Sequence, residues 1–125
     1  MKRTLAAALA VLALTAAPAM AQFTDVNAII QSIGTVQFSR AADKVSGASS
    51  ARVERLSTFL GASSAGQRLV RAEALHERSL SRLHSNLMLS PIAMQAIRAS
   101  GFEVNQIVAL SLDSEGSAIL YADDL

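Results

Sequence analysis

The sequence predicts an α+β protein, with a cleavable signal peptide over residues 1–21 followed by a single small domain over residues 22–125. In that domain we expect three to four helices packed on a two- or three-stranded antiparallel sheet with a C-terminal hairpin. Three observations favour this fold class. A basic start precedes an apolar N-terminal run, apolar residues recur at helical spacing over residues 64–88, and two β-prone runs flank a turn at residues 113–116.

The N-terminal segment has the three parts of a bacterial secretory signal peptide. Residues 2–3 are basic, residues 5–17 form an apolar run, and residues 19–21 read Ala-Met-Ala. We therefore predict cleavage between Ala21 and Gln22, and a periplasmic or secreted mature protein. A membrane anchor is the alternative, but about 13 apolar residues rise only about 20 Å as a helix, against roughly 30 Å of hydrocarbon. No transmembrane segment is expected after signal removal.

Composition excludes several kinds of chemistry. The chain has no cysteine, so it can form neither a disulfide nor a thiolate site, and its core must supply the stability. After signal removal the net charge would be −1, with +4 over residues 22–98 and −5 over residues 99–125. We expect these two parts to fold against each other so that their fields partly cancel; a basic face for an acidic partner is the alternative.

The first half of the domain is predicted to hold a helix, a strand and a second helix. A Thr-Asp pair at residues 24–25 can cap a helix that ends at Gly34. Residues 35–40 alternate apolar and polar side chains, as a half-buried strand does, and residues 42–49 are interpreted as a loop or frayed turn. Residues 50–60 carry apolar side chains at helical spacing, so we expect a helix there.

The longest predicted helix covers residues 64–88. The sequence Gly-Ala-Ser-Ser-Ala occurs at residues 47–51 and again at 61–65, and its serines are predicted to cap the two helices that follow. At about 100° per residue, one face of the long helix is apolar. That face is predicted to comprise Leu69, Ala72, His76, Leu80, Leu83 and Leu87.

The C-terminal part is predicted to contain one more helix and a hairpin. Ser90 is expected to cap the helix, with Pro91 in its first turn and Gly101 at its end. Ile92, Ala96 and Ile97 are expected to form its buried side. The runs at residues 106–112 and 117–122 are β-prone, and the turn between them ends at Gly116, which can adopt a left-handed conformation. We expect this hairpin to pair with the strand at residues 35–40.

Four arginines are predicted to share the polar face of the long helix: Arg68, Arg71, Arg78 and Arg82. Guanidinium groups spread over roughly 20 Å of helix can pair with phosphate or carboxylate groups, such as those of lipids or envelope glycans. Nucleic acid is not an expected partner, because the predicted compartment lacks it and few aromatic side chains are free to stack. The simpler interpretation of these arginines is a solvated face.

Glu73 and His76, followed by Glu77, place two carboxylates and an imidazole about one turn apart, as in some metal-binding helical bundles. The other histidine, His84, lies two turns on and about 12 Å away, too far to share a metal ion with His76. We therefore favour structural roles for Glu73 and His76, and expect no cofactor. The sequence also lacks the nucleophile-elbow, P-loop and dinucleotide-binding motifs.

These observations lead to three functional hypotheses. The first is an exported, non-catalytic interaction or envelope-associated module, whose anionic envelope component or protein partner docks on the arginine-bearing helix or on an unpaired strand edge. The second is a small periplasmic hydrolase or metal-binding enzyme that uses His76 and His84. The third is a purely structural or stress-related envelope protein. The sequence favours a non-catalytic protein but does not identify a specific role.

Overall fold

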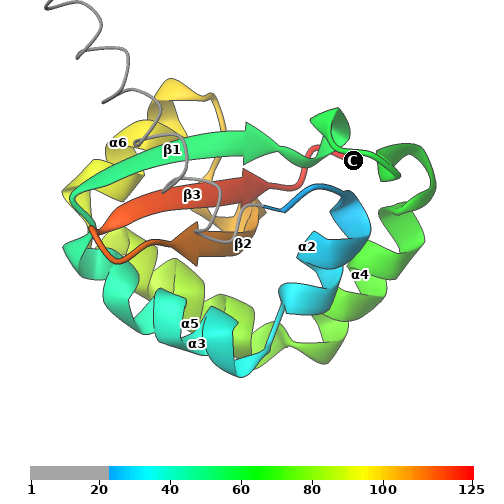
Figure 1. Ribbon diagram of the computed structural model, residues 1–125, viewed down its shortest axis with the longest axis horizontal. Coiled ribbons are helices and arrows are strands. Elements are labelled where there is room, and N and C mark those ends of the chain that lie inside the picture. The colour runs from blue at the N-terminus through cyan, green and yellow to red at the C-terminus, as the bar shows by residue number, and fades with distance from the viewer. Residues whose placement is uncertain (1–22) are drawn as a thin grey trace, which may run out of the picture.

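The computed structural model describes residues 23–125, in which α-helices and short 3₁₀ turns surround a three-stranded sheet (Figure 1). The predicted signal peptide, including the cleavage site between Ala21 and Gln22, lies outside the described residues. The small α+β class is confirmed for the described part. No helix within it is long and apolar enough to cross a membrane.

Two α-helices precede the first strand, three α-helices follow it, and two strands end the described chain. The helices are α2 (Val26–Ser32), α3 (Val36–Lys44), α4 (Gly66–Leu75), α5 (Glu77–Met88) and α6 (Pro91–Ala99). The strands are β1 (Ser50–Arg55), β2 (Ile107–Leu112) and β3 (Ser117–Ala122).

The sheet has the strand order β1-β3-β2 and is mixed. The predicted hairpin is confirmed: β2 and β3 pair in antiparallel fashion, and Gly116 adopts φ +87° in the turn between them. The expectation of a purely antiparallel sheet was wrong, because β1 runs parallel to β3, with Val53 opposite Leu120. Parallel strands need a long crossover connection, and α4, α5 and α6 provide it.

The strand predicted at residues 35–40 is instead the first part of α3, which continues to Lys44. Thr35 is its N-cap, and the Thr35 hydroxyl accepts a hydrogen bond from the backbone N–H of Phe38 at 3.2 Å. Phe38 and Ala42 are buried four residues apart, whereas Val36 is 66% exposed. The apolar period is therefore helical, and most of the predicted loop at residues 42–49 is helix or 3₁₀ turn.

The helix predicted at residues 50–60 was also wrong, because β1 occupies its first half. In β1, Ala51 and Val53 alternate with polar and charged residues, so this segment has the period-2 pattern that was predicted for residues 35–40. The serines before it do not cap a helix. Ser49 instead contacts the hairpin turn: its N–H donates to the Gly116 carbonyl at 2.8 Å and its hydroxyl donates to the Glu115 carbonyl at 3.0 Å.

The single helix predicted over residues 64–88 is divided at His76, whose backbone (φ −114°, ψ 35°) leaves the helical region. Figure 1 shows α4 and α5 running in different directions from this point. The predicted cap at Ser64 is not formed, because Ala65 occupies the N-cap position of α4 without a side-chain hydrogen bond.

The helix predicted after Ser90 is confirmed as α6. The Ser90 hydroxyl accepts a hydrogen bond from the Ala93 N–H at 3.1 Å, and Pro91 lies in the first turn. Of the three residues expected on its buried side, Ile97 is buried, whereas Ile92 is 39% exposed and Ala93 takes its place in the core.

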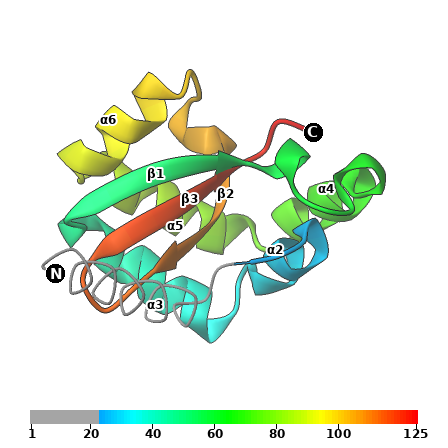
Figure 2. The same cartoon turned by 45° about the horizontal axis from the view of Figure 1, so that its top comes forward.

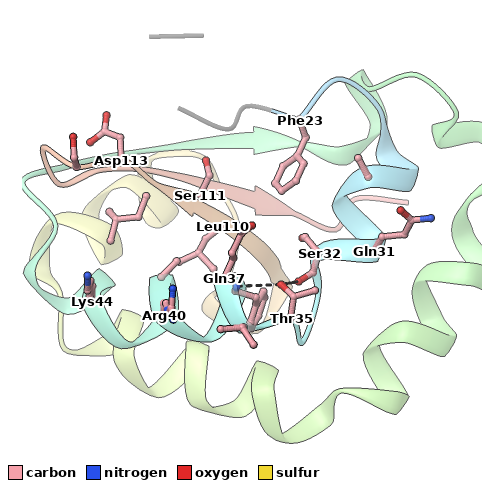
Figure 3. A pocket seen from close by; sticks show the side chains of 16 residues that line it. Phe23, Gln31, Ser32, Thr35, Gln37, Arg40, Lys44, Leu110, Ser111 and Asp113 are labelled. Atoms are coloured by element: carbon pink, nitrogen blue, oxygen red, sulfur yellow. Dashed lines mark hydrogen bonds between the residues drawn. The ribbon is translucent and has the colours of Figure 1, made fainter. Parts of the chain in front are cut away.

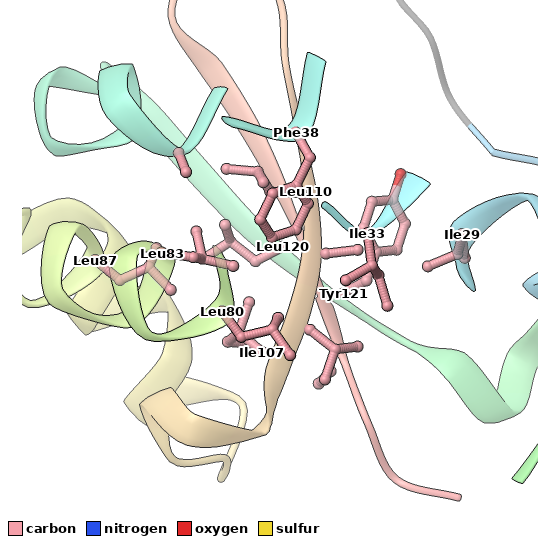
Figure 4. Close-up of a cluster of buried hydrophobic side chains, with 14 of the residues drawn as sticks. Ile29, Ile33, Phe38, Leu80, Leu83, Leu87, Ile107, Leu110, Leu120 and Tyr121 are labelled. Atoms are coloured by element: carbon pink, nitrogen blue, oxygen red, sulfur yellow. The ribbon is translucent and has the colours of Figure 1, made fainter. Parts of the chain in front are cut away.

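The core lies between the sheet and the helices behind it. Leu83 and Leu87 of α5 point toward Leu120 of β3, with Phe38 of α3 beside them (Figure 4). Figures 1 and 2 show α5 and α6 on one face of the sheet, α3 alongside β2, and α2 and α4 beyond the strand ends. Because β2 is an outer strand, its second edge has no strand partner within residues 23–125, and α3 packs against β2.

Candidate functional site

A groove opens between β2, α2 and α3 and encloses about 760 Å³ (Figure 3). We call it the β2 groove. Its walls come from the last residues of β2 and the turn that follows, from the outer side of α3, from the C-terminal half of α2, and from Phe23. This volume lies within the roughly 300–1,000 Å³ typical of ligand sites. The walls mix apolar side chains with amide, hydroxyl and basic groups.

Some backbone groups of β2, which lines this groove, point away from β3. The Asp113 N–H donates to the Ser117 carbonyl at 3.1 Å, which fixes the alternation of the β2–β3 ladder. In an antiparallel ladder, residues alternate between pointing their N–H and C=O groups toward the partner and away from it. Leu110 and Leu112 therefore direct these groups away from β3, and no hydrogen bond within the described part of the chain involves them on that side.

The free charges of the β2 groove are basic. Arg40 and Lys44 lie one turn apart on α3, and neither forms an ion pair with a described residue. Asp113 is the acidic residue among the lining residues that the structure describes. Its carboxylate is engaged in the hairpin turn, where it accepts hydrogen bonds from the N–H groups of Glu115 and Ser117 at 2.9 Å each. The groove therefore presents two unpaired cations.

An aromatic cluster fixes one end of the β2 groove. Tyr121 is 1% exposed and makes edge-to-face contacts with Phe23 and Phe59, with ring centroids 5.3 Å and 5.7 Å apart. Burial raises the pKa of the Tyr121 phenol, which also hydrogen-bonds the Ser111 side chain in the groove wall. The phenol is neutral at physiological pH, so this end of the groove carries no charge of its own.

A smaller cleft of about 250 Å³ lies between α4, α5 and the start of β2. Glu73, Glu77 and His84 line it. Partial burial, together with a hydrogen bond and charge repulsion from Asp123, raises the pKa of Glu73 to about 7. His84 Nε2 lies 2.7 Å from the Ile107 carbonyl oxygen, so Nε2 donates to it and Nδ1 is the nitrogen left for other contacts.

The structure does not bring Glu73 and His76 together as a metal site. The His76 ring lies against Gly34, in the turn between α2 and α3, whereas Glu73 faces Asp123. No group of three or more histidine, aspartate or glutamate side chains among residues 23–125 is arranged to hold a metal ion. His76 and His84 occupy different surroundings, because only His84 lines the small cleft.

The predicted arginine face is distributed over two helices. Arg68 and Arg71 belong to α4, and Arg78 and Arg82 belong to α5, so the break at His76 prevents them from forming one straight stripe. All four are exposed. Arg82 Nε pairs with Asp43 Oδ1 at 2.8 Å, and no ion pair within residues 23–125 involves the other three.

The acidic C-terminal residues do not cover these arginines with ion pairs. The Asp124 carboxylate accepts hydrogen bonds from the N–H and hydroxyl of Ser57 at 2.9 and 2.6 Å, and Asp123 contacts Glu73. Asp113 and Glu115 belong to the hairpin turn. The expected cancellation of charge between the two parts of the chain therefore does not occur through direct contacts with the four arginines in the described region.

Comparison with protein-family models, with curated proteins and with solved structures finds no match for this chain. The geometry of the β2 groove is therefore the main guide to function. Sequence reasoning missed this groove because it assigned residues 35–40 to a strand. A helical signal was present in the spacing of Phe38, Ala42 and Val45, and it would have placed Arg40 and Lys44 on one exposed side of a helix.

Proposed function

We propose that this protein is an exported, non-catalytic interaction module that binds a polypeptide partner in the β2 groove. The outer edge of β2, which has no strand partner within residues 23–125 and lines a cavity of about 760 Å³, is the observation that carries the proposal. A free strand edge offers backbone donors and acceptors to another chain, and adding a strand is a common way for domains to bind peptides.

The make-up of the groove favours binding over catalysis. None of the described residues that line it is a histidine or a glutamate, and its single carboxylate, on Asp113, is held by the hairpin turn. A hydrolase that uses His76 and His84 together would need both imidazoles at one cleft, but His76 packs against Gly34. Among the described lining residues there is therefore no histidine and no free carboxylate, the groups that most often act as general acids or bases.

Export remains part of the proposal and rests on the N-terminal signal pattern of residues 1–21. Cleavage between Ala21 and Gln22 would retain Phe23 and its contact with Tyr121. Intact mass of the protein from the cell envelope fraction tests this point. A mass equal to residues 22–125 supports export with cleavage, and a mass that includes residues 1–21 contradicts it.

Site-specific photo-crosslinking in cells tests the binding site. A photoreactive amino acid at Gln37, which is exposed in the groove wall, is expected to give a discrete polypeptide adduct. The matched control is the same replacement at Gln95, which is exposed on α6 outside the groove. Equal adducts from both positions, or none from Gln37, would contradict a partner site in the β2 groove.

The exposed arginines support a second candidate surface. Arg68, Arg71 and Arg78 are exposed and form no ion pair with a described residue, so they are available to an anionic component of the envelope. A lipid or glycan docked there would give the module an anchoring point separate from the β2 groove.

A further inference from the structure

We propose that the partner segment in the β2 groove is an extended, acidic polypeptide that adds a fourth strand beside β2. Its acidic side chains, on alternate residues, face Arg40 and Lys44 of α3. This inference rests on the proposed function and adds the chemistry of the partner.

The backbone of β2 supports an extended partner. Leu110 is only 4% exposed, yet its N–H and C=O groups point away from β3 and have no partner within residues 23–125. N–H and C=O groups on an outer strand edge are free to bond to the backbone of another chain. Leu112 repeats the same orientation two residues on, which is the spacing at which an added strand forms its hydrogen bonds.

The spacing of the two cations matches a strand. Arg40 and Lys44 are four residues apart on α3, so their backbone positions differ by about 6 Å along the helix axis. Side chains at alternate positions of a strand are separated by about 6.6 Å and lie on the same face. Because α3 lies alongside β2, two acidic side chains of one added strand can meet both cations at once.

The same charges argue against a second copy of this chain as the occupant. Two copies that paired through their β2 edges would each bring an unpaired Arg40 and Lys44 to the junction. Like charges held close together in an interface oppose association. An acidic segment removes that repulsion and neutralises both cations.

Fluorescence anisotropy with designed peptides tests the inference. The probes are labelled seven-residue peptides in which threonine alternates with glutamate, glutamine or lysine. The purified protein is expected to bind the glutamate peptide at least fivefold tighter than the glutamine peptide, and to bind the lysine peptide weakest, because only glutamate pairs with both cations.

The double variant Arg40→Gln with Lys44→Gln is expected to remove the preference for glutamate. Arg68→Gln with Arg71→Gln is the matched control, which removes two exposed cations from α4 and is expected to retain it.

A second measurement reports strand addition directly. Binding of the glutamate peptide is expected to slow amide hydrogen exchange at Leu110 and Leu112 at least tenfold, and N-methylation of the peptide amides that face β2 is expected to abolish binding.

The outcomes separate this inference from the proposed function. Equal affinity for the glutamate and glutamine peptides would overturn the acidic partner, while a groove adduct from Gln37 would still support polypeptide binding. Tight binding without slower exchange at Leu110 and Leu112 would overturn strand addition. Absence of binding by all three peptides would overturn the inference, and the crosslink at Gln37 decides the proposed function independently.

Discussion

The imidazole ring of His76 lies so close to Gly34 that a Cβ atom on Gly34 would overlap the ring. Gly34 forms the turn between α2 and α3 with φ +81°, and His76 is the residue at which α4 and α5 diverge. One contact therefore joins the turn that leads into α3 to the break between two other helices. The turn that leads into α3, which forms a wall of the β2 groove, is thus in contact with this break.

Gly34→Ala is expected to destabilise the fold by about 2–4 kcal/mol, because the left-handed backbone costs about 1–2 kcal/mol and the new methyl group must displace His76. Gly101→Ala is the matched control, because Gly101 has φ +83° but no atom lies within 4 Å of an added Cβ. This variant should lose only the stability that the left-handed backbone costs, about 1–2 kcal/mol. Urea unfolding measures both. Equal losses of stability in the two variants would contradict a role for the His76 contact. So would a Gly34→Ala substitution that destabilises the His76→Ala variant as much as it destabilises the parent protein.

Glu73 is expected to make stability fall as pH rises from about 4.5 to about 7. Its folded pKa of about 7 lies above the ordinary value of 4.5, so the folded state holds a proton that the unfolded state has released. The contribution of Glu73 to the free energy of unfolding is therefore fully present below about pH 4.5 and is lost as the pH rises through about 7. Because Glu73 is only partly buried and solvent screens its charge, we expect an effect of about 1 kcal/mol or less.

Glu73→Gln tests this expectation, since an amide can keep a hydrogen bond to Asp123 without a charge. The variant should be more stable than the parent protein at pH 7 and should show a flatter pH dependence in thermal melts. Glu77→Gln removes a carboxylate from the same cleft without changing the Glu73–Asp123 contact. Its stability should therefore depend on pH as steeply as that of the parent protein. An unchanged slope in Glu73→Gln would contradict the assignment.

Leu83→Ala is expected to cost about 3–4 kcal/mol, because Leu83 is fully buried between α5 and the sheet and its truncation leaves a cavity. Leu75→Ala, at a leucine that is 77% exposed at the end of α4, should change the free energy of unfolding by less than about 0.5 kcal/mol. Urea unfolding of the pair checks the packing of α5. A loss below about 1 kcal/mol for Leu83→Ala would mean that this face of α5 is not in the core.

Arg68→Glu with Arg71→Glu tests the second candidate surface. If α4 binds anionic lipid, the double charge reversal should reduce affinity for vesicles rich in phosphatidylglycerol at least tenfold, while circular dichroism shows an intact fold. Binding by the parent protein should also weaken steeply toward physiological salt, where charges are screened over about 8 Å. Retained, salt-independent binding by the variant would show that these arginines form a solvated face only.

The elements that could be predicted from sequence are those with local signals. The hairpin depends on the turn that ends at Gly116, and α6 depends on the cap at Ser90 and on Pro91, so their own residues determine them. The regions of α3 and β1 have few apolar residues and were assigned the wrong way round. For β1 the deciding contact is distant, because Val53 lies opposite Leu120 of β3, far along the chain.

The candidate site was only partly predictable for the same reason. An unpaired strand edge was expected, but which edge would be free depends on the strand order β1-β3-β2, and parallel pairing has no local signature in a segment as short as β1. The arginines could be identified by helical spacing, yet the break at His76 could not be foreseen. It coincides with the contact to Gly34, which lies in a different part of the chain.

Hydrogen–deuterium exchange on the complex between this protein and its captured polypeptide tests the central claim most directly. We predict slower exchange in β2 and in α3, because the partner would occupy the groove between them and bond to the β2 edge. Exchange in α6, which faces away from the groove, should be unchanged. Protection confined to α4 and α5, with none in β2, would contradict the account and would place the partner on the arginine-bearing helices instead.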